Sequence, residues 1–229
     1  MKTISLINLL YMFIPLIIVW YFYKKWIGNQ SEIIFSTIRM LSQLLLIGYV
    51  LIYILEEKNL LIGAFIILFM ISISAWISFR NINKKSLYEY IQIFISISIS
   101  GLLHLIIMLY FVLELVNIYE PQFVIPLAGM IFANTMNGLS LAIERYESEE
   151  KENNSFYEAR KISFKAAMIP QINSFLAVGL VSLPGMMTGQ ILSGIDPLIA
   201  VRYQIMIMLS MLSGTGISII IYFLIRKKY

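Results

Sequence analysis

Cysteine is absent from this chain of 229 residues, so it contains no disulfide, no thiolate metal site and no cysteine nucleophile. Charge is also scarce, because only 13% of the residues are charged, whereas soluble domains carry about 25%. No glycine is followed by lysine, which excludes a P-loop that would cradle the phosphates of ATP. The net charge of +4 lies mostly in short segments and does not indicate a nucleic-acid partner. The chain therefore has no catalytic residues that we can identify and no separate catalytic domain.

Apolar sequence fills the chain instead, since 59% of the residues are hydrophobic and the mean hydropathy is +0.83. A helix needs about 20 apolar residues to cross a bilayer. Seven runs reach that length, at about 4–23, 37–55, 60–79, 91–116, 122–143, 172–193 and 199–225. The fourth contains the alternating stretch ISISIS (95–100), but the run is too long for a strand, and serine hydroxyls can bond back to their own helix. The sequence predicts an all-α polytopic membrane protein, with one transmembrane domain spanning residues 1–229.

Basic residues are distributed unequally between the two predicted sides of the membrane. Short loops rich in lysine and arginine stay in the cytoplasm. Fourteen of the 17 basic residues fall on one side: Lys24, Lys25, Arg39, Arg80, Lys84, Lys85, Arg145, Lys151, Arg160, Lys161, Lys165, Arg226, Lys227 and Lys228. The other side keeps Lys2, Lys58 and Arg202. We therefore predict that the N-terminus lies outside and the C-terminus in the cytoplasm.

The sixth run is unusual because proline and glycine interrupt it. In IPQINSFLAVGLVSLPGMMTGQILSGIDP (169–197), Pro184 and Gly185 fall near the middle. Proline removes one backbone hydrogen bond of a helix and clashes with the preceding turn. In a membrane such a break is tolerated where protein or a water-filled cavity satisfies the freed carbonyl groups, and broken helices of this kind form many transporter sites. We predict a broken spanning helix with a pivot at Pro184 and Gly185.

The predicted outer loops are only a few residues long, and one long loop, at about 144–171, is predicted to be cytoplasmic. Its first part, YESEEKENNS (146–155), is polar and predicted to be mobile. Its second part, FYEARKISFKAAMIP (156–170), has apolar residues at mixed helical spacing among basic ones, which favours a short amphipathic helix. Two roles fit such a helix: it lies on anionic lipid headgroups, or it is a lever that docks into a cytoplasmic partner.

Amide side chains occur inside the fifth run, PLAGMIFANTMNGLSLAIER (126–145). Asn134 and Asn137 are three residues apart and share a helix face. One interpretation is helix packing, in which small residues allow close approach and asparagines bond across the contact. The other is that both asparagines face a translocation path together with Met186, Met187 and Gln190. The chain holds 13 methionines, whose thioethers can bind a soft metal ion but also fill membrane cores, so metal ligands stay undefined.

The single histidine, His104, lies near the middle of the fourth run. An ionisable residue inside the membrane suggests function, but a metal site usually needs several ligands. We therefore favour a histidine that is bonded to a neighbouring helix. A retinal protein would need a lysine inside the last helix, and the sequence has none between Arg202 and Arg226.

Three stretches carry a resemblance to a known family: RMLSQLLLIGYVLIYIL (39–55), PLAGMIFANTMNGLSLAIER (126–145) and AMIPQINSFLAVGLVSLPGMMTGQILSGIDPLIAVRYQIMIM (167–208). Together with Ala75 and Trp76 they resemble the permease subunits of bacterial iron-export ABC transporters of the FetB type. Plant aluminium-tolerance permeases belong to the same family. The resemblance runs from about Arg39 to Lys227, and its most specific block is LVSLPGMMTGQI (180–191). His104 is not part of the family pattern.

The resemblance implies a permease that works with a separate P-loop ATPase subunit, in two copies of each. ATP and magnesium would bind in that partner, and this chain would hold no cofactor of its own. Coupling to the ATPase would fall to the loop at 144–171, with Glu144, Arg145, Glu158, Arg160 and Lys161 as candidate contacts. This chain lacks a Leu-Gly-Ala-type stretch that family members have before the sixth run, which leaves the coupling helix undefined.

Several alternatives stay open at the level of the sequence. The resemblance implies a multi-pass protein of the bacterial cell membrane that exports iron or another metal ion. Plant relatives are associated with nucleotide sugars, so a nucleotide sugar or other small solute is the alternative substrate. A non-transporting anchor or receptor, or a passive channel, would need no ATPase. The broken sixth run argues against an anchor, which has no reason to interrupt a helix at the midplane.

Overall fold

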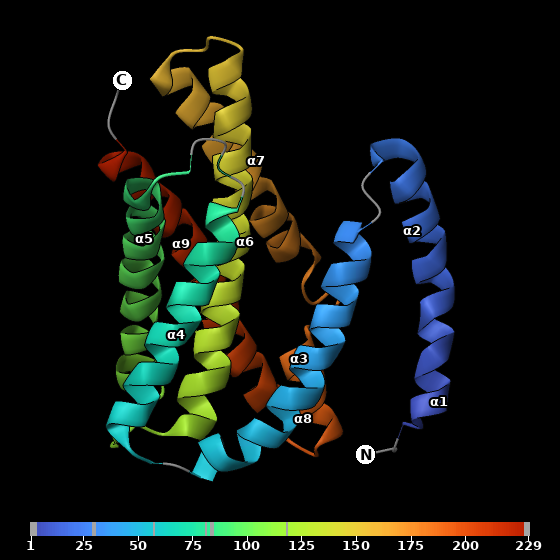
Figure 1. The fold of residues 1–229 in the computed structure, drawn as a ribbon. Helices are drawn as coiled ribbons and strands as arrows, with labels where there is room; N and C mark the ends of the chain where they lie inside the picture. Colours follow the sequence, from blue (N-terminus) through green and yellow to red (C-terminus); the bar gives the residue numbers. More distant parts are fainter. Residues whose placement is uncertain are drawn as a thin grey trace. The chain divides into compact units, whose positions relative to one another are not determined.

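A computed structural model describes residues 4–28, 31–56, 58–80, 82, 85–117 and 119–226. Lys2, Lys84, Lys227 and Lys228 of the topology prediction lie outside the described residues. The chain is divided into two compact units, Met1–Glu57 and Lys58–Tyr229. Figure 1 shows that both units are built from helices, and the described residues contain no strand beyond one isolated bridge between Val178 and Ser182.

The first unit consists of two long helical segments. The first begins with α1 (Leu6–Leu9) and η1 (Leu10–Met12) and continues as α2 (Phe13–Ile27), and the second is α3 (Ser31–Glu56). The hydroxyl of Tyr23 donates to Glu32 Oε2 at 2.7 Å and so connects the end of α2 to the start of α3. The described residues of these helices are mostly exposed apolar side chains, as expected for helices that face lipid.

The second unit contains the remaining helices, all visible in Figure 1. They are α4 (Leu60–Phe79), α5 (Leu87–Ile106) with its π-helical continuation η2 (Ile107–Val112), α6 (Pro121–Lys151), α7 (Phe156–Ala177), α8 (Gly185–Leu192) and α9 (Pro197–Ile225). The stretch ISISIS (95–100) lies within α5, which confirms the predicted helix. The hydroxyl of Ser96 donates to Gln92 O at 2.7 Å, one turn back in the same helix.

Local sequence signals determine where several of these helices begin. Ser86 precedes α5 and Ser155 precedes α7, and each side chain accepts a hydrogen bond from the backbone N–H of the glutamate three residues later, Glu89 or Glu158. This Ser-x-x-Glu spacing is typical of a helix N-terminus. Asp196 caps α9 in a similar way, with Leu198 N donating to its Oδ1 at 2.7 Å. Polar caps thus fix helix starts that hydropathy alone does not reveal.

Six of the seven predicted runs form helices that are long and apolar enough to cross a membrane, within the described residues. The run at 60–79 coincides with α4, and the run at 199–225 is α9 less its first two residues. The sixth run is the exception, because residues 172–193 are divided between the end of α7 and the whole of α8. The chain is therefore an all-α, polytopic, multi-pass membrane protein whose sixth apolar run is not one continuous helix.

The break in the sixth run lies before Pro184, where residues 178–184 form a tight turn between α7 and α8. α7 ends at Ala177, whose carbonyl accepts from Val181 N at 2.8 Å and from Ser182 N at 3.2 Å. Gly179 has a φ of +84°, a conformation that glycine adopts without strain. Pro184 then caps α8 with extended backbone. The predicted break in the sixth run is confirmed, but it covers residues 178–184 and is not a kink at Pro184 alone. The pivot at Pro184 and Gly185 stays a prediction.

Small residues allow the helices of the second unit to pack closely. A Cβ added to Gly101 in α5 would collide with the ring of Phe132 in α6. A Cβ added to Gly138 in α6 would collide with the side chain of Thr215 in α9. Because lipid tails are as apolar as leucine, close packing and interhelical hydrogen bonds hold membrane helices together. These glycines therefore set the separation of α5, α6 and α9.

The α6–α7 end of the second unit is the end at which α4 and α9 finish, α5 begins, and α6 leads into α7 (Figure 1). The described basic residues assigned to the cytoplasm within this unit lie on the segments that meet there: Arg80, Lys85, Arg145, Lys151, Arg160, Lys161, Lys165 and Arg226. Arg202 lies near the start of α9, at the opposite end. The segregation of charge along the unit thus agrees with the predicted loops, while the orientation in the membrane stays a prediction.

Candidate functional site

Asn134, near the middle of α6, connects three helices. Its Nδ2 donates toward Gln171 Oε1 in α7 at 3.1 Å, and toward Met211 O and Thr215 Oγ1 in α9 at 3.0 and 2.8 Å. Gln171 Nε2 donates in return to Asn134 Oδ1 at 3.3 Å. The amide nitrogen has two hydrogens, so the three acceptors share them. The predicted interhelical role of Asn134 is therefore confirmed, and the contact joins α6, α7 and α9.

A cavity of about 350 Å³ lies beside Asn134, and we call it the methionine cavity. Three elements contribute the described residues that line it: Met130, Ala133, Asn134 and Asn137 from α6, Pro184, Gly185 and Met186 at the start of α8, and Gln204, Ile207, Met208 and Met211 from α9. The break that divides the sixth run is followed directly by α8, whose start lies against this cavity. Sequence-distant polar and sulfur-bearing side chains thereby share one space.

The structure brings together most of the residues that were predicted for a translocation path. Asn134, Asn137 and Met186 line the methionine cavity, together with the predicted pivot residues Pro184 and Gly185. Two predicted residues lie elsewhere. Met187 lines a neighbouring cavity of about 320 Å³ between α7 and α9. Gln190 is not among the described residues that line either cavity, because it lies a full turn further along α8.

Sequence analysis missed the contribution of α9. Gln204, Met208 and Met211 follow the spacing i, i+4, i+7, which places them on one face of the helix. Gln204 is only 6% exposed, and its Oε1 accepts no hydrogen bond from the described residues. Gln204 and Met208 also line the neighbouring cavity, so the two cavities are adjacent. The helical spacing of these residues was a signal that sequence analysis could have used.

The predicted cytoplasmic loop at 144–171 is a helical hairpin instead. α6 continues to Lys151 and α7 begins at Phe156, so residues 152–155 alone connect them. The mobile stretch predicted from residue 146 is wrong as far as Lys151, because these residues form the last turns of α6. Glu149 is 2% exposed and accepts a hydrogen bond from Asn154 Nδ2 at 2.6 Å, which closes the turn. The helix predicted at 156–170 is confirmed as the first part of α7.

All five residues predicted to contact an ATPase lie on this hairpin: Glu144, Arg145, Glu158, Arg160 and Lys161. Arg145 forms an ion pair with Glu149 on the same helix. The guanidinium of Arg160 lies over the rings of Phe156 and Tyr157, at 5.7 and 5.3 Å from their centroids. These contacts orient the side chains on the surface of the hairpin, and their role in coupling stays a prediction.

Arg226, just after α9, is the centre of a charged cluster that sequence analysis did not predict. Its guanidinium lies 3.4 Å from Glu89 in α5, and 3.6 and 3.7 Å from Glu147 and Glu150 in α6. It also donates a hydrogen bond to the hydroxyl of Tyr222. Burial lowers the pKa of the Arg226 guanidinium, but Tyr222, Glu89 and Tyr146 together outweigh that effect and raise it. The sequence indicated only a topology role for Arg226.

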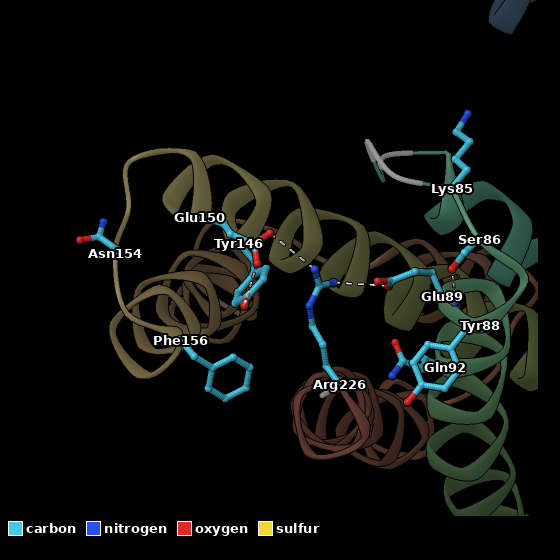
Figure 2. A pocket seen from close by; sticks show the side chains of 10 residues that line it. All are labelled: Lys85, Ser86, Tyr88, Glu89, Gln92, Tyr146, Glu150, Asn154, Phe156 and Arg226. Carbon is cyan, nitrogen blue, oxygen red and sulfur yellow. Dashed lines mark hydrogen bonds and ion pairs between the residues drawn. The ribbon is translucent and has the colours of Figure 1, made fainter. Parts of the chain in front are cut away.

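Figure 2 shows the guanidinium of Arg226 between Glu89 on one side and Tyr146 and Glu150 on the other. A cavity of about 500 Å³ opens beside them, and Asn154 in the turn of the hairpin is also among its lining residues. The cluster therefore joins α5, the α6–α7 hairpin and the end of α9. Glu147 and Glu150 are three residues apart in a chain with few charges, and this spacing could have indicated a charged cluster.

His104 is buried in α5 and bonded to α9. Its Nε2 lies 2.8 Å from Ser213 Oγ, and its Nδ1 lies 2.7 Å from Ser100 O. The hydroxyl of Ser100 itself donates to Gly214 O at 2.6 Å. The predicted bond from His104 to a neighbouring helix is confirmed. In the described part of the chain, no group of three or more His, Cys, Asp or Glu side chains is placed to hold a metal ion.

Comparisons with known proteins agree with the resemblance seen in the sequence. The chain is 35% identical over 228 residues to the Probable iron export permease protein FetB of Escherichia coli, covering 90% of this chain and 85% of that protein. It is 33% identical over 223 residues to a UPF0014 membrane protein of Synechocystis, covering 90% and 86%. Protein ALUMINUM SENSITIVE 3 of Arabidopsis thaliana is 27% identical over 219 residues, covering 86% and 76%. No solved structure matches the chain.

The match to a family model extends over residues 4–229, so both structural units and the methionine cavity fall within it. That model describes an uncharacterised protein family. The chain therefore belongs to the UPF0014 family of membrane proteins, as do its relatives in bacteria and plants.

Proposed function

We propose that this chain is the membrane-spanning permease subunit of an ABC transporter, and that a separate P-loop ATPase subunit drives it. The name of its Escherichia coli relative, Probable iron export permease protein FetB, supports transport of a metal ion. The absence of a P-loop from the sequence fits this division of labour, because ATP must then be hydrolysed elsewhere. Two permease chains and two ATPase chains would form the complex, in the bacterial cell membrane.

The observation that carries the proposal is the continuity of α6. This helix runs from the α6–α7 hairpin, where charged side chains gather, to Asn134 and the methionine cavity. A rigid helix transmits a displacement at one end to the other, as allosteric elements do. A displacement of the hairpin by a docked ATPase would thus be transmitted along α6 to the cavity, without an additional connecting element. The orientation predicted from the basic residues places the hairpin in the cytoplasm.

The break before α8 gives the cavity a movable wall. Because α7 ends at Ala177 and α8 begins at Gly185, α8 can shift against α7 by changes within residues 178–184. Pro184 and Gly185 lie at the end of that break and line the cavity. In this mechanism, closure of the ATPases moves the hairpin, and α8 then opens the cavity to the outer side. The direction that we propose is export.

The proposal is tested by purifying the chain from its native membrane in mild detergent and identifying what co-purifies. We expect a P-loop ATPase. The hairpin variant Glu144→Ala/Tyr157→Ala/Lys161→Ala changes only exposed side chains, and we expect it to lose the ATPase while it remains folded. The matched control is Lys58→Ala/Arg202→Ala, at the opposite end of the second unit, which should retain the ATPase.

Two outcomes would contradict the proposal. If no ATPase is recovered under conditions that preserve permease dimers, an ATP-driven mechanism is wrong, and a passive channel or a membrane anchor becomes the better interpretation. If the ATPase is recovered equally with the hairpin variant and its control, the partner docks elsewhere. Metal-stimulated ATP hydrolysis by the recovered complex distinguishes a metal ion from a nucleotide sugar as the transported substrate.

A further inference from the structure

The methionine cavity has an unusual combination of ligand atoms. Among the described residues, four methionines line it: Met130 from α6, Met186 from α8, and Met208 and Met211 from α9. They come from three different elements, so methionines line the space from more than one helix instead of forming a stripe on a single one. Methionine often fills membrane cores, but these four line a space of about 350 Å³ that protein atoms leave open.

Gln204 adds an oxygen or amide donor to this lining. The residue is 94% buried, and its Oε1 accepts no hydrogen bond from the described residues. Buried polar atoms are almost always paired, so one that has no partner in the protein requires an explanation such as an ion or a ligand. The side chain lies in the wall shared by the methionine cavity and its neighbour. A bound ion that coordinates the amide would supply the missing partner.

Charge limits which ions the cavity can hold. None of the described residues that line it is ionisable. Hard cations such as Mg²⁺ and Fe³⁺ prefer carboxylate oxygens, whereas thioethers are soft ligands that select Cu⁺ and similar ions. The start of α8 also brings the positive end of a helix dipole to the cavity wall. A positive wall disfavours a divalent or trivalent cation more strongly than a monovalent one.

We infer that the methionine cavity is a binding site for a soft monovalent metal cation, of the class of Cu⁺ and Ag⁺. The ligands are the thioethers of Met186, Met208 and Met211, with Gln204 as an additional contact. This inference rests on the proposed transport function, and it specifies the class of ion that the permease carries at this point of its path. It distinguishes the cavity from a site for ferric or other hard ions.

The first experiment measures Ag⁺ binding to the purified full-length chain in detergent by titration calorimetry. We expect about one Ag⁺ per chain, and at least a tenfold weaker affinity in Met186→Leu/Met208→Leu/Met211→Leu. Leucine has nearly the volume of methionine, so packing is preserved while the thioethers are removed. The matched control is Met12→Leu/Met40→Leu/Met108→Leu, which changes three methionines outside the cavity lining and should bind Ag⁺ like the unmodified chain.

The second measurement needs no variant. X-ray absorption of the Ag⁺-loaded chain should show sulfur atoms as nearest neighbours of the metal. Nearest neighbours that are only oxygen or nitrogen would overturn the inference, as would equal Ag⁺ affinity in the cavity triple variant and its control. Anaerobic Fe²⁺ that displaces Ag⁺ at equal concentration would also overturn it, because thioether ligands would then provide no selectivity.

These experiments separate the inference from the proposed function, because they use the chain alone and require no ATPase. If an ATPase co-purifies but Ag⁺ does not bind, the ABC permease survives and the soft-ion site is wrong. If Ag⁺ binds through sulfur but no ATPase is found, the site stands and the ATP-driven mechanism is wrong.

Discussion

The guanidinium carbon of Arg226 lies 4.5 Å from the ring centroid of Tyr146, where the end of α9 meets the last turns of α6. The same guanidinium faces Glu89 at the start of α5 and Glu147 in α6. One side chain therefore fastens α9 to two other helices beside the α6–α7 hairpin. Any movement of the hairpin against α9 has to break this contact or carry α9 with it.

Replacing Arg226 by glutamine should destabilise the protein. Arg226 and Glu147 each have only 11% of their side-chain surface exposed, so the variant removes the guanidinium from beside a largely buried carboxylate. Breaking a buried pair in this way costs about 3–5 kcal/mol, and the 54% exposure of Glu150 places the expected loss at the lower end. Thermal unfolding in detergent measures it. Lys161→Gln is the control, because its pair with Glu158 is exposed and 3.8 Å long, and a change below about 1 kcal/mol is expected. Equal melting temperatures for the two variants would contradict the structural role of Arg226.

Hydropathy predicted the spans well where one apolar run forms one helix. The limits of α4 coincide with the predicted run, and α9 begins two residues before it. Hydropathy alone did not divide the sixth run, because it describes composition and not helix continuity. Pro184 and Gly185 indicated the break, but not that α7 ends as early as Ala177. The polar residues at 146–151 predicted a loop, although Tyr146 and Glu149 are buried against neighbouring elements. The predicted helix start at Phe156 was correct, and the capping signal from Ser155 to Glu158 explains it.

The sequence predicted only some of the residues of the candidate site. Asn134 and Asn137 could be found because amides are rare in an apolar run and because three residues of separation place them on one face. Their partners could not be found, since Met211 and Thr215 lie far along the chain and meet Asn134 only through the packing of α9 on α6. Periodicity assigns faces within a helix but does not say which faces meet.

Replacing Gly138 by alanine should separate α6 from α9. An added Cβ would collide with the Cγ2 of Thr215, and overpacking of this kind costs about 1–3 kcal/mol. The double variant Gly138→Ala/Thr215→Ser removes that methyl group and retains the hydroxyl, so we expect part of the lost stability to return. Gly189→Ala in α8 is the control, because an added Cβ there meets nothing within 4 Å. Chemical denaturation of the unmodified chain and the three variants tests the contact. If Gly138→Ala has the same denaturation midpoint as the unmodified chain, the contact is refuted.

The hydrogen bonds between Asn134 and Gln171 should appear as a coupling energy. In a double-mutant cycle, we expect the effects of Asn134→Ala and Gln171→Ala on the free energy of unfolding to differ from additivity by about 1 kcal/mol. This value lies within the range measured for polar contacts between membrane helices. The comparison cycle pairs Asn137→Ala with Gln171→Ala, because these two residues share no hydrogen bond in the described part of the chain. Their effects on the free energy of unfolding should be additive within about 0.5 kcal/mol. Unfolding free energies from both cycles provide the test. Equal coupling in the two cycles would mean that α6 and α7 interact through general packing alone.

Replacing Pro184 by alanine should separate ATP hydrolysis from transport without unfolding the protein. Pro184 has a φ of −62° and a ψ of 150°, which alanine can adopt, so the change in stability should stay below about 1 kcal/mol. The variant nevertheless loosens the end of the non-helical segment at 178–184, which positions α8 against the methionine cavity. We expect the reconstituted complex to bind its ATPase and hydrolyse ATP while it transports less substrate per ATP. Pro197→Ala is the control, because Pro197 starts α9 and is not among the described residues that line the cavity. Full transport per ATP in the Pro184 variant would show that α8 does not need a rigid connection to α7, and the movable wall would then have to lie elsewhere.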